Sequence, residues 1–553
     1  MTAVDTYPFD PPAAARDFGA ATAQGQEWCR RGLGWLYGFH HEEAVLCFER
    51  ALSEDPSCAF AHWGIGFALG PNYNKPWEIF SPKERARVIA RAQKAAEKAQ
   101  ACDGPEWVCA LANALPSRLP ETPEVEEFRP LAEAFAERMV AVKERFPEDL
   151  DICALAVEAL MTCTPWALWH LPTGTPAHHA HTLRAKAMLD EAFAQKPGAE
   201  DHPALLHLYV HLMEMSPTPE MAVRRGTRLC EVARDSGHLL HMGTHIHVQV
   251  GDYARVVSHN RSAFEVDRRY WDHIGDALGF YRLYMGHNLA FEAWGAMFLA
   301  APGPALQACD DLDTLFPDSF IRTHPPLFEA FTTVRDHVLM RFGMWQALLD
   351  LPLPGDGDSE FYPFAIALRH ATRAVAAANL GHHAQADADL AAFETARDRI
   401  DPERVLFNNT CWDILAVAEG MARGEAAVKR GAVAEGLAHL REAVANEDAL
   451  SYEEPWAWMM PTRHALGALL LDAGLAEEAE DVFRTDLGLK PGLIRACHHP
   501  DNIWALQGLD DCLKLRGADT ERAYIAPRLA VARAWAEIEV AAACQCALKA
   551  ARL

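Results

Sequence analysis

Several common sequence signatures are absent from this chain of 553 residues. Residues 1–19 are acidic and Pro-rich and lack the apolar core of a secretory signal. Nowhere do about 18 apolar residues follow one another, so we expect no membrane span and a cytoplasmic location. Basic residues are few: 51 Lys and Arg stand against 77 Asp and Glu, for a net charge of −26. Because nucleic acids and anionic membranes bind clustered cations, we expect neither as a partner.

Motifs of several enzyme classes are also missing. The chain has no G-x-S-x-G, no phosphate-binding P-loop and no G-x-G-x-x-G between a strand and a helix, which argues against serine hydrolases, NTPases and dinucleotide enzymes. The zinc motif H-E-x-x-H does not occur. The 14 cysteines include no C-x-x-C pair, although Cys544 and Cys546 form a C-x-C. The pattern predicts reduced thiols rather than a disulfide framework.

β-branched alternating runs are nearly absent, and a helical period persists along the chain, so we predict an all-α fold. A 34-residue spacing supports a tetratricopeptide-type helix-turn-helix solenoid, in which small residues let paired helices pack closely. The positions that carry it are Gly32, Trp35, Ala44, Phe48, Ala51 and Pro56, and again Gly467, Leu470, Ala479, Phe483 and Pro491.

We expect one solenoid over residues 1–553, closed around a central concave pocket. It would comprise N-terminal repeats over 24–150, a His-rich centre over 151–300 and C-terminal repeats over 301–553. Within the centre, the pattern predicts helices over 203–215, 219–233, 238–250 and 276–299.

The chain is rich in histidine, with 26 residues of this type, and their spacing matters more than their number. His207, His211 and Glu214 share one face of a predicted helix, as do His238, His241 and His245. His207 and His241 are 241 − 207 = 34 residues apart, and so are His211 and His245 (245 − 211 = 34). Positions one repeat apart lie side by side in a solenoid, so these imidazoles can converge.

A third helix would present Tyr281, Tyr284 and His287 to the same concavity. Imidazoles with a nearby carboxylate are ligands for transition metals, so we predict one or two ions, with Fe or Cu favoured and Zn or Mn possible. The predicted ligands are His207, His211, Glu214, His238, His241, His245 and His287. Glu214, Tyr281 and Tyr284 would serve in catalysis, with oxidative chemistry on a small molecule slightly favoured over zinc hydrolysis.

Two other interpretations stay open at this stage. The histidines could form a hydrogen-bonded polar interior or a groove for an anionic ligand, without a metal. Alternatively, the array is a scaffold whose groove binds a peptide or partner protein. The oligomeric state and the roles of three polar pairs are not assigned from the sequence: His498/His499, Asn408/Asn409 and Glu453/Glu454. Asp501 or Asn502 is expected to cap a helix, and His40-His41 to pack and cap within a turn.

Several segments together resemble the tetratricopeptide repeat protein 38-like family, in its bacterial and fungal branch. They include residues 39–44, 63–65, 70–77, 158–161, 207–214, 241–246, 407–411, 454–456, 462–467 and 499–502, so the likeness spans nearly the whole chain. The family typically has Pro in place of Gly243, His in place of Ala290 and a residue other than His at His247. The resemblance implies the repeat fold and gives no reaction.

Overall fold

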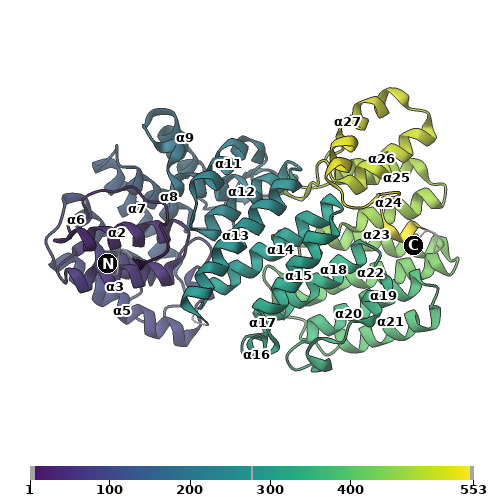
Figure 1. Ribbon diagram of the computed structural model, residues 1–553, viewed down its shortest axis with the longest axis horizontal. Coiled ribbons are helices and arrows are strands. Elements are labelled where there is room, and N and C mark those ends of the chain that lie inside the picture. Colours follow the sequence, from purple (N-terminus) through teal and green to yellow (C-terminus); the bar gives the residue numbers. More distant parts are fainter. Residues whose placement is uncertain (1–5, 276–277, 549–553) are drawn as a thin grey trace. The chain divides into compact units, whose positions relative to one another are not determined.

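A computed structural model describes residues 6–275 and 278–548, and its fold is all-α, as the sequence predicts. Within these ranges, β-strands occur only in two short antiparallel hairpins, apart from one isolated β-bridge. One pairs β1 (Trp169–His170) with β2 (Thr175–Pro176). The other pairs β3 (Val405–Leu406) with β4 (Asn409–Thr410). The rest of the regular structure is helical, and successive helices pack as antiparallel pairs (Figure 1).

Contacts divide the chain into two compact units. Unit 1 comprises Met1–Ile246 and Ser262–Met285, and unit 2 comprises His247–Arg261 and Gly286–Leu553. Each unit is described by itself. The single closed solenoid over 1–553 and its divisions at 24–150, 151–300 and 301–553 stay predictions.

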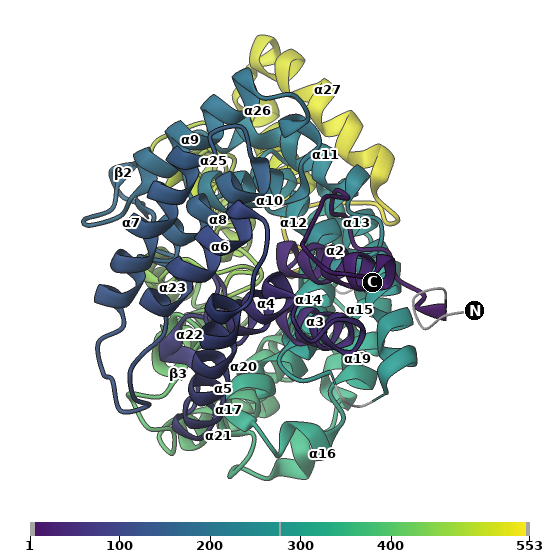
Figure 2. The same ribbon diagram turned by 90° about the vertical axis from the view of Figure 1, so that its left-hand side faces the viewer.

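Unit 1 is a succession of helical hairpins. In Figure 2, α7, α8 and α9 follow one another as neighbours, in agreement with their contacts. Its α-helices are α2 (Ala23–Tyr37), α3 (His41–Glu54), α4 (Ala59–Ala68), α5 (Pro82–Ala101), α6 (Glu106–Ala114), α7 (Arg129–Arg145), α8 (Leu150–Met161), α9 (Thr182–Gln195), α10 (Pro203–Met213) and α11 (Val223–Val232). Short 3-10 turns are η1 (Trp77–Ile79), η2 (Leu115–Arg118), η3 (Ala199–Asp201) and η4 (Pro219–Ala222). Three helices have residues in both units: α12 (Gly237–Gln249), α13 (Tyr253–Ile274) and α14 (Tyr281–Leu299).

Unit 2 repeats the same architecture. Its hairpins include α20 with α21, α22 with α23, and α24 with α25 (Figure 1). The α-helices are α15 (Pro302–Leu315), α16 (Asp318–Ile321), α17 (Pro325–Phe328), α18 (Val334–Arg341), α19 (Trp345–Asp350), α20 (Pro363–Asn379), α21 (His383–Arg397), α22 (Cys411–Lys429), α23 (Val433–Ala449), α24 (Thr462–Asp472), α25 (Ala476–Asp486), α26 (Ile503–Arg516) and α27 (Asp519–Trp535). The 3-10 turns are η5 (Glu329–Thr333), η6 (Pro354–Gly357), η7 (Arg495–Cys497) and η8 (Gln545–Ala547).

The repeat glycines explain how the hairpins pack. In unit 1 the fully buried Phe48 of α3 lies between Gly32 of α2 and Gly64 of α4. A Cβ at Gly32 would lie 2.5 Å from the Phe48 ring, and one at Gly64 would lie 2.4 Å from it. Each of the three helices can therefore approach the next only because two of them carry no side chain at the contact.

Unit 2 has the same arrangement around Phe483 of α25. A Cβ at Gly467 of α24 would lie 2.5 Å from that ring, and one at Gly508 of α26 would lie 2.3 Å from it. Gly32, Phe48, Gly467 and Phe483 are positions that the 34-residue spacing identifies. Their packing confirms a helical repeat of the tetratricopeptide type.

The predicted central helices agree closely with those observed. The helix expected over 203–215 is α10, the one over 219–233 is η4 followed by α11, and the one over 238–250 is α12. The helix expected from Asp276 is α14, which begins at Tyr281, and Asp276 itself lies outside the described residues.

Two further observations concern the chain as a whole. None of the helices in the described ranges combines the length and the apolar character needed to cross a bilayer, and the cytoplasmic location stays a prediction. The expectation that all cysteines are free thiols is wrong at one place, because Cys544 and Cys546 form a disulfide. Adjacent sulfurs in a C-x-C can reach each other without any contribution from the fold.

Candidate metal centre

Three buried imidazoles from two neighbouring repeats converge in unit 1. His207 and His211 lie one turn apart on α10, and His238 lies at the start of α12. One ring nitrogen of each lies within 4.8 Å of one ring nitrogen of the other two. All three side chains are at most 2% exposed. The two predicted helices therefore converge here through His238, and neither 34-residue pair, His207 with His241 or His211 with His245, belongs to this group.

The second ring nitrogen of two of these histidines already has a partner. His207 Nδ1 lies 2.7 Å from the backbone oxygen of Tyr37, the last residue of α2, and helix-terminal carbonyls lack a partner within their own helix. His211 Nδ1 lies 3.0 Å from Glu214 Oε1. Because both partners are acceptors, each Nδ1 carries the proton and donates it, which leaves each Nε2 with a lone pair.

The remaining nitrogens are suited to bind a cation. Within the described residues, Nε2 of His207 and Nε2 of His211 are buried and have no hydrogen-bond partner. Burial, followed by the neighbouring imidazoles, lowers the pKa of both side chains well below its usual value, so both are neutral. Metal-binding histidines typically donate the other ring N–H to a carbonyl or carboxylate, and this is the arrangement observed.

Glu214 lies behind the imidazoles and connects the two helices. It follows the last residue of α10 and is completely buried. Besides its bond with His211, its carboxylate makes an ion-pair contact with His245 of α12, whose Nδ1 lies 3.1 Å from Oε2. Burial raises the pKa of Glu214, and His245 opposes this shift. With both oxygens engaged, the carboxylate is placed to orient imidazoles, whereas the sequence also predicted it as a ligand and a catalytic group.

His241 and His245 extend this network along α12. Their Nε2 atoms lie 2.7 Å apart. Polar contacts therefore run from His241 through His245 and Glu214 to His211.

Aromatic rings cover the three imidazoles. The Phe39 ring lies 4.5 Å from that of His207, 5.9 Å from His211 and 5.8 Å from His238. Phe39 adopts a positive φ of 54°, which non-glycine residues rarely adopt and which is most often found at functional sites. The Tyr73 ring lies 4.8 Å from His211, and the Tyr284 ring lies 4.6 Å from His238.

Tyr73 is positioned by a tight turn between two prolines. The side chain of Asn72 accepts from the backbone N–H of Asn74 at 2.9 Å and of Lys75 at 2.8 Å, which is the geometry of an Asx turn. The turn holds Tyr73 fully buried against the histidines.

A pocket of about 370 Å³ lies on the other side of Phe39. Phe39 and His41 form part of its wall, together with charged side chains of both signs. Among these, Lys75 pairs with Glu84 at 2.8 Å, and its ammonium lies 4.5 Å from the centre of the Phe280 ring. Phe39 thus separates a charged pocket from the buried imidazoles.

Two other predicted site residues, Tyr281 and His287, lie outside the group of three imidazoles. Tyr281 donates to Asp267 at 2.8 Å and stacks on His40 with ring centres 3.7 Å apart, so its proton is directed away from the imidazoles. His287 belongs to unit 2, where its ring packs on Phe291 at 5.5 Å. The predicted capping role of His40 is confirmed, since its ring accepts from the backbone N–H of Glu43.

Sequence reasoning did not identify Phe39, Tyr73 or the Tyr37 carbonyl as parts of this site. Phe39 and Tyr73 lie in segments that carry the family resemblance, and that resemblance is the sequence signal that could have pointed to them. Their role depends on a positive φ and an Asx turn, which residue spacing does not predict.

Comparisons with known proteins add little to this geometry. No protein-family model matches the chain, and no curated protein matches it. Among solved structures, it is similar to one titled "Structure of Naa15/Naa10 bound to HypK-THB", with 12% identity and a TM-score of 0.22, covering 92% of this chain and 70% of that chain. A superposition of this quality carries no argument about function.

Proposed function

We propose that this helical-repeat protein binds one transition-metal ion through His207, His211 and His238, and uses it on a small molecule. One observation carries the proposal. Three buried imidazoles converge, and in two of them, His207 and His211, Nδ1 contacts an oxygen acceptor while Nε2 has no hydrogen-bond partner within the described residues. Buried lone pairs are costly unless something binds them. The charged pocket beyond Phe39 supplies room for a substrate, which would meet the ion only when the Phe39 ring moves aside.

The donor set narrows the choice of metal. Three neutral imidazoles with an open fourth position are typical of catalytic Zn²⁺ and also suit copper. Non-haem iron enzymes commonly use two histidines and a carboxylate, and the nearest carboxylate here, Glu214, is engaged by two imidazoles. We therefore favour Zn or Cu over Fe. The metal found in the protein would separate hydrolytic from oxidative chemistry.

The test is elemental analysis of untagged protein, with His207→Ala and His238→Ala as variants and His382→Ala as a matched control. His382 is exposed and lies in unit 2. We expect close to one ion per chain in the wild type and the control, and a strong loss in the other two. Circular dichroism and thermal unfolding would verify that the variants fold. Folded wild-type protein that takes up no ion after incubation with Zn²⁺ or Cu²⁺ would refute the proposal.

A partner-binding scaffold is the second candidate, favoured by the repeat fold and by one surface. Tyr524, Val531 and Trp535 share a face of α27 and are 77%, 62% and 60% exposed. Large exposed apolar residues on one helix face are typical of interaction sites. By contrast, the helix faces that carry His207 and His211 are buried and cannot line an open groove. Co-purification of a defined partner that Tyr524→Ser/Trp535→Ser abolishes, and His207→Ala does not, would support this function.

We also propose that the chain belongs to the tetratricopeptide repeat protein 38-like family. The support is the set of resembling segments together with the repeat packing around Phe48 and Phe483. If so, conservation of His207, His211 and His238 in relatives would be the expected pattern, and an alignment in which these positions vary freely would weigh against the metal centre.

A further inference from the structure

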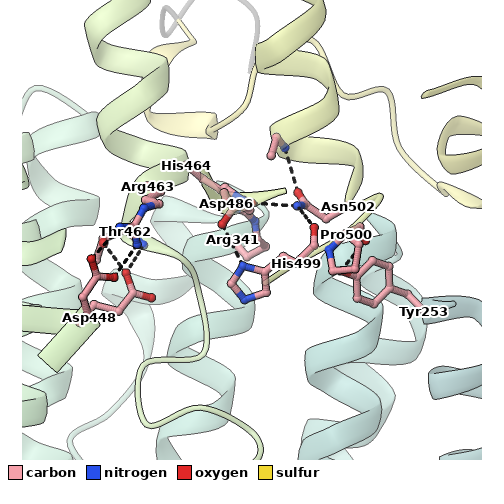
Figure 3. Close-up of polar contacts among 12 residues, drawn as sticks. Tyr253, Arg341, Asp448, Thr462, Arg463, His464, Asp486, His499, Pro500 and Asn502 are labelled. Atoms are coloured by element: carbon pink, nitrogen blue, oxygen red, sulfur yellow. Dashed lines mark hydrogen bonds and ion pairs between the residues drawn. The ribbon is translucent and has the colours of Figure 1, made fainter. Parts of the chain in front are cut away.

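A second buried polar cluster lies in unit 2, centred on Asp486 at the end of α25 (Figure 3). Its carboxylate accepts from His464 Nε2 at 2.9 Å, from His499 Nδ1 at 2.8 Å and from the Asn502 amide at 2.9 Å. The backbone N–H of His499 also donates to the backbone oxygen of Asp486. Although burial alone would raise it, these histidines hold the pKa of Asp486 well below its usual range. Asn502 also caps α26, as the sequence predicted.

This network fixes the orientation of His499. Because Nδ1 is bonded to Asp486, Nε2 is the ring nitrogen left on the other side of His499. That nitrogen has no hydrogen-bond partner within the described residues, and the side chain is 2% exposed. His499 lines a cavity of about 110 Å³, which is somewhat smaller than the ~150 Å³ cavity that holds benzene in an engineered protein.

Three further polar atoms, on residues that line the cavity, are likewise buried and unpartnered within the described ranges. They are Glu447 Oε1, Trp456 Nε1 and Trp458 Nε1. Buried polar atoms in native structures usually bind protein or ordered water, so four on residues of one cavity wall indicate polar binding capacity there. The set contains two acceptors and two donors, and it is joined by aromatic faces. Such a combination would satisfy a ligand that both donates and accepts.

The carboxylates of the wall determine the charge of that ligand. Four carboxylates line the cavity, from Glu447, Asp448, Glu453 and Asp486, against the guanidinium of Arg463. Asp448 already pairs with Arg463 through two contacts of 2.6 Å (Figure 3). Arg463 also acts electrostatically on Glu447, so it is Glu453 that is left without a cationic partner among the described residues of the cavity.

The bonds of these two carboxylates come from neutral donors. Glu453 accepts from the backbone N–H of Asn408 at 3.0 Å, and Glu447 accepts from the backbone N–H of Thr462 at 3.0 Å. Burial raises the pKa of each to about 7. A buried carboxylate is stabilised by a cation, so the cavity favours a positively charged occupant.

We propose that this cavity binds a small organic ammonium ion that carries a hydroxyl group. The ammonium would lie against Glu447 and Glu453 and the rings of Trp456 and Tyr452, as organic cations do in aromatic cages. The hydroxyl would donate to His499 Nε2 and accept from an indole N–H. A bare metal ion fits less well, because none of the convergent donor sets in the described part of the chain combines Glu447, Glu453 and His499. The proposal does not depend on the metal centre of unit 1.

The experiment measures binding of choline and ethanolamine to the full chain by isothermal titration calorimetry. The neutral isostere 3,3-dimethylbutan-1-ol separates charge recognition from apolar fit. We expect at least one cation to bind saturably and about tenfold or more tighter than the isostere. Glu447→Gln should weaken that binding by about tenfold, because it removes the negative charge that faces the cation.

Glu435→Gln is the matched control, since Glu435 is exposed on the same helix, α23, and should leave binding unchanged. If Glu447→Gln does not fold, Trp456→Leu replaces it and should weaken the cation selectively. Equal binding of the isostere, no saturable binding of either cation up to about 10 mM, or full binding by the folded Glu447→Gln variant would overturn the proposal.

Discussion

Replacement of Glu214 by Gln tests how the metal centre is organised. The carboxylate accepts from His211 at 3.0 Å and lies 3.1 Å from Nδ1 of His245, in a site with no solvent exposure. Gln has nearly the same shape but offers one acceptor oxygen and one donor amide. One imidazole must then turn or move its proton to Nε2, where it would block the lone pair that faces an ion.

The size of the effect follows from the role of such carboxylates. Loss of a group that orients a metal-binding histidine typically reduces metal affinity about 10- to 100-fold, which corresponds to about 1.4–2.7 kcal/mol. We therefore expect Glu214→Gln to retain one metal site of weaker affinity. The assay is competition for Zn²⁺ between metal-free protein and a chromophoric chelator. Glu97→Gln serves as the control, since Glu97 is exposed on α5 of the same unit.

Two results would contradict this reasoning. Wild-type affinity in Glu214→Gln would mean that the carboxylate does not orient the ligands. A loss as complete as that of His211→Ala would mean that Glu214 binds the ion directly, as the sequence pattern also allows.

Three other perturbations address the fold and its pH dependence. Gly64→Ala should lower the free energy of unfolding by about 1–2 kcal/mol, because the Phe48 ring, held by Gly32 on its other side, cannot move away from the new methyl group. Chemical denaturation measures this loss of stability. Adding Phe48→Leu to the same chain should restore most of the lost free energy. Burial, then repulsion from Arg118, lowers the pKa of His41 to about 3, so its neutral form contributes stability that is complete above pH 6.5 and is lost as the pH falls towards 3. Between pH 6.5 and 5.5, wild type should lose about 1 kcal/mol more stability than His41→Gln, and parallel pH dependences would refute this. Asp486→Asn should destabilise the protein by about 3 kcal/mol because buried donors lose their anion, and an unchanged melting temperature would contradict that account.

The sequence predicts the repeat fold well because packing in this fold depends on short-range patterns. Gly32 and Phe48 identify the hairpin because only a residue without a side chain fits against that ring. The same logic locates α10 and α12, whose apolar and histidine periods are helical. The repeat brings α10 and α12 together, but the group that converges contains His238, which is 31 residues from His207 (238 − 207 = 31), rather than a 34-residue pair.

What the sequence does not predict is which atoms of these side chains are available. His211 and Glu214 look equivalent as ligands in the sequence, yet one faces the cluster and the other supports it. The difference arises from Glu214 following the end of α10, from where it reaches His245 of the next repeat. Likewise, His499 and Glu453 are separated by 46 residues (499 − 453 = 46) and meet at one cavity only through the three-dimensional packing of unit 2.

The aromatic cover over the histidines has a kinetic consequence. Tyr73 and Phe39 bury the ring nitrogens, and the Asx turn at Asn72 fixes Tyr73 in place. An ion bound there would have no direct route to solvent, so its escape would wait for local opening of this turn. Release to an added chelator should then approach a constant rate as the chelator concentration rises, and Asn72→Ala should increase that limiting rate. A release rate that keeps rising in proportion to chelator would show that the cover does not govern exchange.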